Sequence, residues 1–302
     1  MTKRFWIDFL LQFEYYYQMS VHERLVSSGV PETFAPVAMP FRAPFEPTPP
    51  TDEELLALKM EELMAIKEAE PGKLPSFVFV IPDGNRRGAV ARGLSKLEGH
   101  ALGAKVVWDG LHTFEQLGIP NVGIWIWSED NEIGRSAEER ASVFALAGDY
   151  VPKFKEEADE KGWKIRHLGR KDRMPASLRE QLKEAEKGTG GNKGMTLWLA
   201  LDYNWQRDLA QAINGARKEL AEAGFDGEID DDEAGHFYAK YTDAPPVDLL
   251  IRTSGEYRTS GLGLLVKDAE LVVIDEFLPD VKEWQWPDAM LEYTKRVKRK
   301  GA

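Results

Sequence analysis

Six short apolar segments, separated by longer amphipathic stretches, constrain the fold of this chain more than any other feature of its sequence. The segments are nearly continuous hydrophobic runs, as expected for parallel strands that are covered on both faces. The pattern therefore predicts an α/β fold with a single domain, in which helices flank a mostly parallel six-stranded sheet. The predicted strands are Phe77–Ile81, Val122–Trp127, Trp163–Leu168, Met195–Leu201, Val247–Ile251 and Leu271–Ile274, and the predicted helices cover about residues 96–117, 136–160, 175–187, 206–223, 231–241 and 287–299.

Residues 1–73 precede this pattern and read as a partly helical, partly extended N-terminal extension of a main domain at residues 74–302. Aromatic residues recur at helical spacing in residues 1–20, but Asp8 interrupts the apolar stretch, which argues against a secretory signal. Such a helix packs on the main domain or a partner chain, or lies at a membrane interface. Residues 30–52 hold seven prolines and predict a linker, after which Thr51 and Glu54 form the signature of a helix start.

Composition excludes several functional classes. The 302 residues carry a formal net charge of −12, which argues against a nucleic-acid partner. The chain has no cysteine, so disulfides, thiolate metal sites and cysteine nucleophiles are excluded. Its five histidines form no HExxH motif, and no apolar run approaches the ~18 residues of a membrane-spanning helix. We therefore expect a cytoplasmic protein, with peripheral contact to a membrane surface as a further option.

Polar, glycine-bearing segments follow three of the predicted strands, at Pro82–Arg87, Ser128–Asn131 and Arg252–Ser260. Because ligands of open parallel sheets bind beyond the carboxyl ends of the strands, these segments are expected to form one site. Arginine forks, hydroxyl groups and backbone N–H groups suit a diphosphate.

Each segment also has a plainer interpretation. Asp83-Gly84-Asn85 alone is a common turn, His100 alone is more often structural, and Arg258 alone is a solvated side chain. The acidic run at residues 226–233 predicts a solvated turn and the first turn of a helix, not a metal site, because it does not match DDxxD.

Taken together, five segments resemble the cis-prenyltransferases, the family of undecaprenyl and decaprenyl diphosphate synthases, over about residues 75–302. They occur in the family's order: Pro82-Asp-Gly-Asn-Arg-Arg87, Glu98-Gly-His-Ala-Leu-Gly103, Ser128-Glu-Asp-Asn131, Arg252-Thr-Ser-Gly-Glu256 and Ala269-Glu-Leu271. The resemblance implies an Mg²⁺-dependent enzyme that condenses isopentenyl diphosphate with an allylic diphosphate, such as farnesyl diphosphate, to give a polyprenyl diphosphate. It also implies a homodimer.

The resemblance further implies a role for each matching residue. Asp83 and Asn131 would be catalytic, and Asp83 and Glu270 would hold Mg²⁺, with Glu270 acting across a dimer interface. Residues of the first two segments and of the loop after the second predicted strand would surround the allylic diphosphate, namely Gly84, Asn85, Arg86, Arg87, Lys96, His100, Ser128 and Arg135. Residues of the later segments and of the C-terminus would grip isopentenyl diphosphate, namely Arg252, Arg258, Thr259, Ser260, Arg299 and Gly301.

The sequence departs from the family mainly where aromatic residues shape the substrate cavity. Gly88 stands where the family has tryptophan, and Gly261–Leu265 replaces a segment that contains phenylalanine and tryptophan. Two alternatives to chain elongation therefore stay open: a diverged enzyme that makes a short, branched or cyclised isoprenoid, and a non-catalytic subunit of a two-chain prenyltransferase. An unrelated nucleotide-binding enzyme would need a glycine-rich phosphate loop, and neither GxGxxG nor GxxxxGK[ST] follows the first strand.

Overall fold

The computed structural model of the protein describes residues 49–129 and 131–296, and residues 50–302 belong to one compact unit. The aromatic segment 1–20, most of the linker and the last six residues lie outside the described part, so the interpretations placed on them stay predictions. None of the described helices is long and apolar enough to cross a membrane.

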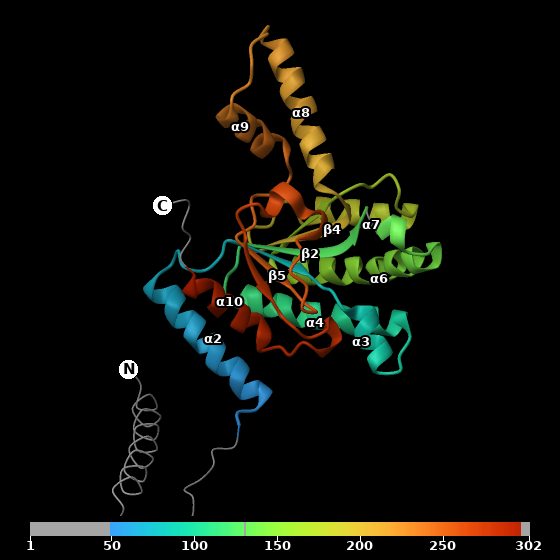
Figure 1. Ribbon diagram of the computed structural model, residues 1–302, viewed down its shortest axis with the longest axis vertical. Coiled ribbons are helices and arrows are strands. Elements are labelled where there is room, and N and C mark those ends of the chain that lie inside the picture. Colours follow the sequence, from blue (N-terminus) through green and yellow to red (C-terminus); the bar gives the residue numbers. More distant parts are fainter. Residues whose placement is uncertain (1–48, 130, 297–302) are drawn as a thin grey trace, which may run out of the picture. The chain divides into compact units, whose positions relative to one another are not determined.

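Six strands form one parallel sheet in the order β3-β4-β2-β1-β5-β6, which confirms the predicted fold class (Figure 1). Every predicted strand is present, with bounds that differ by no more than two residues. The strands are β1 (Phe77–Ile81), β2 (Asn121–Ser128), β3 (Lys164–Leu168), β4 (Thr196–Tyr203), β5 (Leu249–Arg252) and β6 (Glu270–Val273).

One helix precedes the first strand and the others lie between and after the strands, mostly where the hydrophobic spacing predicts them. They are α2 (Asp52–Ala69), α3 (Asn85–Ala91), α4 (Lys96–Gln116), α5 (Asn131–Gly134), α6 (Ala137–Lys161), α7 (Ala176–Gly188), α8 (Trp205–Glu222), α9 (Asp231–Tyr241) and α10 (Gln285–Lys295), with the 3-10 turns η2 (Ser260–Val266) and η3 (Leu278–Asp280). Helices α4, α6 and α10 gather on one side of the sheet, whereas α8 and α9 project away from it (Figure 1). The acidic run near residue 230 provides the first turn of α9, as predicted, and Asp230 and Glu233 form a capping box there.

Two hydrophobic clusters explain why the strands read as continuous apolar runs. In β1 all five residues are buried, and successive side chains enter opposite clusters. Val78 and Val80 join the larger cluster under α2, α4, α6, α7 and α10, whereas Phe79 joins the smaller cluster with residues of η2. Both faces of the sheet are thus covered, which leaves the strand ends as the place for a site.

Helix α2, which we assigned to the N-terminal extension, packs on the main domain. Its Leu63 is fully buried in the larger cluster, and Lys59 forms an ion pair with Asp288 of α10. The indole N–H of Trp284 donates to Asp52 at 2.9 Å. Thr51 and Glu54 form the predicted capping box. The compact unit begins at Pro50 and so includes α2.

His167 is a buried titratable group in β3, outside the polar strand-end segments. Its side chain lies 2.8 Å from the carbonyl oxygen of Leu201, and the residue is 6% exposed. Burial disfavours the charged imidazolium and lowers the pKa of His167 to about 4, although the bond to Leu201 acts in the opposite direction.

This pKa predicts acid sensitivity. His167 binds a proton near pH 6.5 in the unfolded chain but only near pH 4 in the folded chain. The neutral ring therefore contributes its full stabilisation of the folded state above pH 6.5, and this stabilisation is lost as the pH falls towards 4. Between pH 7 and pH 5 we expect the unfolding free energy of the wild type to fall by about 2 kcal/mol through this residue. Urea unfolding of the wild type and of His167→Asn at pH 7 and pH 5 checks this, because the gap between the two proteins should narrow at pH 5. A gap that is independent of pH would contradict it.

Candidate active site

The loops that follow β1 and β5 lie side by side at the carboxyl edge of the sheet. Ile81 and Arg252 are register partners, so Asp83 stands just beyond the end of β1 and next to the end of β5. The chain continues from β1 to β2 on one side and returns as β5 on the other. This reversal of strand order creates the crevice in which open parallel sheets bind ligands.

Asp83 and Arg252 form an ion pair at the centre of this crevice. An Nη2 group of Arg252 donates to Oδ2 of Asp83 at 2.8 Å, and the backbone N–H of Gly84 donates to Oδ1 at 2.6 Å. Burial alone would raise the pKa of Asp83, but Arg252, with help from Gly84 and Arg87, outweighs it and holds that pKa below its ordinary value. Asp83 is therefore a carboxylate at neutral pH, with one guanidinium fixed beside it.

Arg252 also orders the loop that follows its own strand. Its Nη1 group donates to the carbonyl oxygen of Arg258 and, at 2.9 Å, to the hydroxyl of Ser260. Thr253 donates to the carbonyl oxygen of Asp83 at 2.6 Å and so joins the two loops. The Nε atom of Arg252 is buried and has no partner among the described residues, which leaves one donor unused within the site.

Arg87 connects the same two loops from α3. It donates to the hydroxyl of Ser254 at 2.5 Å and lies 3.3 Å from Asp83 and 3.5 Å from Glu256. Its guanidinium also lies 5.2 Å from the centre of the Phe277 ring. Arg258 pairs with the other oxygen of Glu256 at 2.8 Å, so three arginines converge around two carboxylates.

A second basic group lines another wall of the crevice, at α3 and at the turn between α5 and α6. Arg86 and Arg135 share Glu139, at 3.4 Å and 3.2 Å. The guanidinium of Arg135 also lies 5.0 Å from the centre of the Trp127 ring. His100 of α4 faces these residues, and its Nε2 atom is buried without a hydrogen-bond partner in the part of the chain that the structure describes. Burial, reinforced by the charge of Arg135, lowers the pKa of His100, so the ring is neutral at neutral pH.

Two glycines allow α4 to approach α3 closely enough to form this wall. A Cβ atom at Gly99 would lie 2.4 Å from the carbonyl oxygen of Asn85, and one at Gly103 would lie 1.9 Å from the side-chain oxygen of Asn85. That buried oxygen accepts no hydrogen bond from any described residue, whereas the side-chain amide of Asn85 donates to the carbonyl of Pro82 at 3.3 Å. The glycines thus fix where Asn85 lies relative to Asp83.

The loop after β2 is held by a network that our sequence interpretation missed. Ser128 and Asn131 bond to each other, with the N–H of Asn131 donating to the Ser128 hydroxyl at 3.2 Å. Between them, Glu129 accepts from Arg173 at 3.2 Å. Arg173 also clamps both oxygens of Asp202, which is 1% exposed and has a positive φ of 57°. No motif signals this link, because Arg173 and Asp202 come from separate, distant segments.

Replacing Arg173 by alanine should therefore destabilise the protein. The substitution leaves the Asp202 carboxylate buried without its partner, and we expect the unfolding free energy to fall by about 3 kcal/mol. Arg173→Lys should recover part of this loss. Arg179→Ala, which removes an exposed arginine of α7, should change the unfolding free energy by less than about 0.5 kcal/mol. Urea unfolding of the three variants tests the prediction, and equal small effects of both alanine variants would contradict it.

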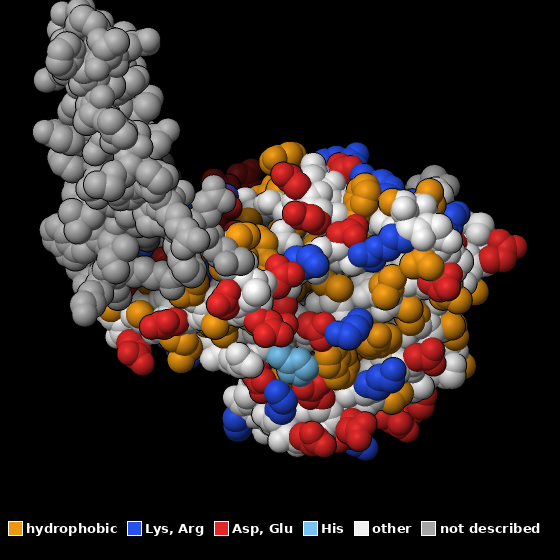
Figure 2. Space-filling model, turned by 90° about the horizontal axis from the view of Figure 1, so that it is seen from below, with side chains coloured by type: hydrophobic (Ala, Val, Ile, Leu, Met, Phe, Trp, Pro, Cys, Tyr) orange, Lys and Arg blue, Asp and Glu red, His pale blue; other side chains and the backbone are white. Residues whose placement is uncertain are grey.

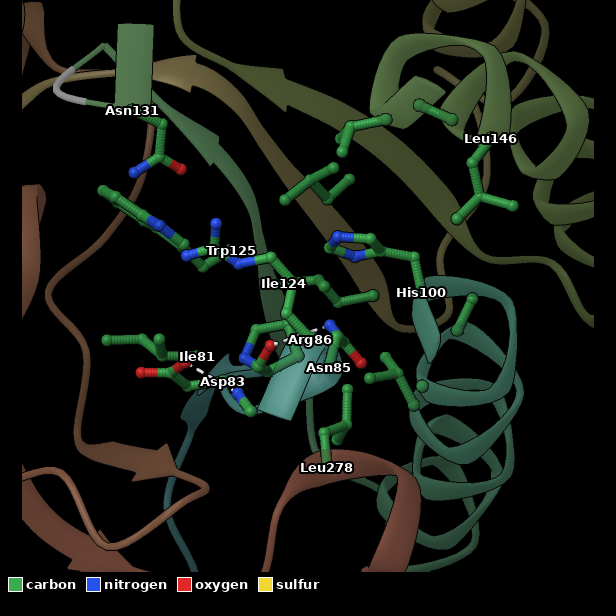
Figure 3. A pocket seen from close by; sticks show the side chains of 18 of the residues that line it. Ile81, Asp83, Asn85, Arg86, His100, Ile124, Trp125, Asn131, Leu146 and Leu278 are labelled. Carbon is green, nitrogen blue, oxygen red and sulfur yellow. Dashed lines mark hydrogen bonds between the residues drawn. The ribbon is translucent and has the colours of Figure 1, made fainter. Parts of the chain in front are cut away.

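A cavity of about 870 Å³ opens at this edge of the sheet and extends into the larger hydrophobic cluster (Figure 3). Its outer part is lined by charged and polar side chains that include Asp83, Asn85, Arg86, His100, Asn131 and Arg252. Its inner part lies between the sheet and helices α4, α6 and α7, and is lined by apolar side chains that include Ile124, Leu146, Phe154, Leu182, Leu199 and Leu201. The cavity can therefore hold a molecule with an anionic end and a long apolar body.

Most of the residues predicted for the site meet around this cavity. Gly84, Asn85, Arg86, Arg87, Lys96, His100, Asn131, Arg135, Arg252, Arg258 and Ser260 line it together with Asp83. Ser128 and Thr259 do not line it. Ser128 is buried and supports Asn131, whereas Thr259 is exposed. Arg299 and Gly301 lie outside the described residues. Glu256 was quoted in a motif but received no role, although it lines the cavity.

Glu270 is not brought to Asp83 within one chain. In the pairing of β5 with β6, Glu270 lies opposite Leu249. The pair of Arg252 with Val273, at the carboxyl end of the two strands, comes three residues later. Strands rise ~3.3 Å per residue, so about 10 Å of sheet separates Glu270 from the edge where Asp83 lies. Glu270 instead pairs with Arg296 at 3.1 Å. A shared metal site in a single copy of the chain is thus not supported.

The donor chemistry at Asp83 still fits Mg²⁺. A hard cation of this kind is commonly bound by one or two carboxylates together with substrate phosphates and water, rather than by a complete protein cage. Asp83 offers an ionised carboxylate at the cavity wall. Among the described residues there is no cluster of three histidine or acidic side chains that could enclose a metal.

Comparison with known proteins assigns the chain to a family. The family described as putative undecaprenyl diphosphate synthase matches residues 81–301. Isoprenyl transferase 2 of Streptomyces avermitilis is 34% identical over 233 residues, covering 76% of this chain and 81% of that protein. A tritrans,polycis-undecaprenyl-diphosphate synthase of Thermococcus kodakarensis, described as specific for geranylgeranyl diphosphate, is 30% identical over an alignment that covers 80% of this chain and 92% of that protein.

Solved structures agree with this assignment. A crystal structure of lavandulyl diphosphate synthase from Lavandula x intermedia, in complex with dimethylallyl diphosphate, aligns with a TM-score of 0.67 at 28% identity and covers 74% of this chain and 97% of that one. A probable undecaprenyl diphosphate synthase from Campylobacter jejuni shares the fold, with a TM-score of 0.61 at 20% identity. The chain is a prenyltransferase and belongs to the cis-prenyltransferase family of isoprenyl transferases and undecaprenyl diphosphate synthases.

Proposed function

We propose that the protein condenses isopentenyl diphosphate with an allylic diphosphate, in the presence of Mg²⁺, to give a linear polyprenyl diphosphate. The observation that carries this proposal is the continuous cavity, in which an arginine-rich rim leads directly to an apolar interior between the sheet and helices α4 and α6. A growing chain needs both parts, because its diphosphate stays at the rim while its hydrocarbon tail becomes longer.

The two basic walls correspond to two diphosphates. We assign the wall of Arg86, Lys96, His100 and Arg135 to the allylic substrate, and the wall of Arg252, Arg258 and Ser260 to isopentenyl diphosphate. Breaking the allylic carbon–oxygen bond leaves a diphosphate anion, and guanidinium groups already fixed around it stabilise that charge without reorganising. When bound at Asp83, Mg²⁺ would add Lewis-acid stabilisation of the same leaving group.

Asn131 and Asp83 flank the place where the two substrates meet. Asn131 is held by Ser128 and faces the cavity, where its amide can orient the isopentenyl group (Figure 3). Neutral His100 can donate or accept a hydrogen bond at the allylic diphosphate without changing its charge. The apolar wall excludes water from the allylic cation, so that the double bond of isopentenyl diphosphate attacks it and a proton is then lost.

A second candidate function is the synthesis of a short, branched isoprenoid. The alignment with lavandulyl diphosphate synthase, which covers 97% of that chain, is the observation that favours it. Incubation with each allylic primer alone and with isopentenyl diphosphate separates the two functions. Elongation requires isopentenyl diphosphate and Mg²⁺ and gives products with more than ten carbon atoms. A product formed from dimethylallyl diphosphate alone would support the second function instead.

We further propose that the working enzyme is a homodimer in which Glu270 serves the site of the partner. Since Glu270 and Asp83 lie apart within one chain, mixing Asp83→Ala with Glu270→Ala tests this directly. Random exchange makes half of the dimers mixed, and one of the two sites in each mixed dimer keeps both residues. About one quarter of the wild-type activity should then return. If both residues act in the same chain, the mixture should stay as inactive as its components.

A further inference from the structure

Acidic side chains are common on the surface of this protein. The chain carries 51 of them, and Figure 2 shows a face on which acidic and basic side chains are interspersed. A single exposed carboxylate beside an arginine therefore needs no functional explanation. Glu139 of α6 differs from such a surface pair, because its side chain is only 11% exposed and it contacts two arginines that line the cavity.

Glu139 holds these two arginines without lining the cavity itself. Arg86, Arg135 and His100 are lining residues, whereas Glu139 is not. Its Oε1 atom lies 3.4 Å from Nη1 of Arg86 and 3.2 Å from Nη1 of Arg135, so one carboxylate connects α3 to the turn before α6. Neither arginine forms an ion pair with another of the described residues. The remaining N–H groups of both guanidinium forks can thus bind an anion in the cavity.

The carboxylate of Glu139 also offsets the mutual repulsion of the two arginines. Burial lowers the pKa of Arg135, the charge of Arg86 lowers it further, and Glu139 acts in the opposite direction. The pKa of His100 responds to the same charges, because burial and the two arginines lower it and Glu139 opposes them. Removing the charge of Glu139 would leave two like charges side by side, with no carboxylate between them.

Arg86 depends on Glu139 more than Arg135 does. The guanidinium of Arg135 lies 5.0 Å from the centre of the fully buried Trp127 ring, which gives it a second contact. The side chain of Arg86 is 44% exposed, and Glu139 is its one ion-pair partner in the described part of the chain. A long side chain loses conformational freedom when a ligand orders it, and a contact formed before binding removes part of that cost.

We propose that Glu139 is a positioning residue, which preorganises Arg86 and Arg135 for the diphosphate of the allylic substrate. The inference rests on the proposed function, which assigns this wall of the cavity to that diphosphate. Glu139 should affect only one of the two substrates, because Arg252 of the other wall is held by Asp83 instead.

The variant Glu139→Gln tests this role, since it keeps the length of the side chain and a hydrogen-bond acceptor but removes the charge. We expect KM for the allylic primer to rise about tenfold, because the substrate itself must then order the arginines, and KM for isopentenyl diphosphate to change by less than about twofold. Glu139→Asp retains the charge and should recover part of the loss. Glu138→Gln, which removes an exposed carboxylate of the same helical turn, should behave like the wild type. An equal rise in both KM values would indicate a general structural role and overturn the inference.

A binding measurement separates this role from the reaction. Calorimetric titration with farnesyl thiolodiphosphate, in which sulfur replaces the bridging oxygen and slows ionisation, reports the affinity of the allylic site without turnover. Glu139→Gln should weaken binding about tenfold in the otherwise wild-type chain, but less than about threefold in an Arg86→Ala chain, where one of the residues that it positions is missing. Equal weakening in both chains, or none in either, would overturn the inference and leave the proposed function standing. A wild type that does not bind the analogue would contradict the assignment of this wall to an allylic diphosphate, and with it both proposals.

Discussion

The variant Asp83→Ala is expected to lose about a thousandfold or more in kcat/KM, because the substitution removes the carboxylate that we propose holds Mg²⁺ at the leaving diphosphate. Asp83 is the acidic side chain at the end of the central strand, it is ionised at neutral pH, and it is joined to Arg252 at 2.8 Å. The loss should appear in kcat rather than in the affinity for the apolar tail, whose contacts lie deeper in the cavity. Steady-state incorporation of labelled isopentenyl diphosphate measures it.

Two controls separate charge from structure at this position. Asp83→Asn keeps the size of the side chain and a hydrogen-bond acceptor for Arg252, so it should fold like the wild type and yet lose comparable activity. Asp159→Asn removes an exposed carboxylate of α6 that pairs with Lys155, and it should leave activity unchanged. An active Asp83→Asn enzyme would contradict a role for the carboxylate charge.

The second large effect is expected from Gly103→Ala. A Cβ atom at this position meets the side-chain oxygen of Asn85 at 1.9 Å and Leu278 at 2.7 Å, so either Asn85 or the whole of α4 must move. We expect the unfolding free energy to fall by about 1–3 kcal/mol and kcat/KM to fall by about a hundredfold. Activity should fall more than stability alone explains, because Asn85 directly follows the Asp83-Gly84 turn.

Gly148→Ala is the matched control for this prediction. Gly148 also lies within a helix, but its added Cβ atom would have its nearest neighbour at 3.5 Å, in Gln181. Relief of the conformational entropy of glycine should make this variant neutral or more stable by up to about 1 kcal/mol. Thermal unfolding and activity assays of the two variants provide the comparison. A fully active Gly103→Ala enzyme would show that the position of Asn85 does not matter.

The sheet and the main site could be predicted because both depend on short, continuous sequence patterns. Each strand is an apolar run between helical patterns, and Asp83, Asn131 and Arg252 each stand at or just after a strand end. In a parallel sheet all carboxyl ends share one edge, so proximity follows from topology alone. Glu270 could not be placed in this way, because it is the first residue of β6 and therefore lies at the opposite edge of the sheet.

What could not be predicted depends on packing between distant segments. The clamp of Arg173 on Asp202 and Glu129 joins strand β4 to the loops that follow β2 and β3, and no sequence spacing relates these segments. The requirement for glycine at position 103 follows only from the position of Asn85, and the place of α2 in the core only from the burial of Leu63. Such contacts have no local pattern of hydrophobicity or charge, so they emerge only in three dimensions.

The structure of the product tests the central claim most directly. Purified protein is incubated with isopentenyl diphosphate, each allylic primer and Mg²⁺, and the dephosphorylated product is analysed by mass spectrometry and NMR. We expect a linear chain in which several new units with cis double bonds follow the primer. EDTA should abolish the formation of this product. A branched or cyclic ten-carbon product, or no incorporation with any primer, would contradict the proposal that this cavity elongates a polyprenyl chain.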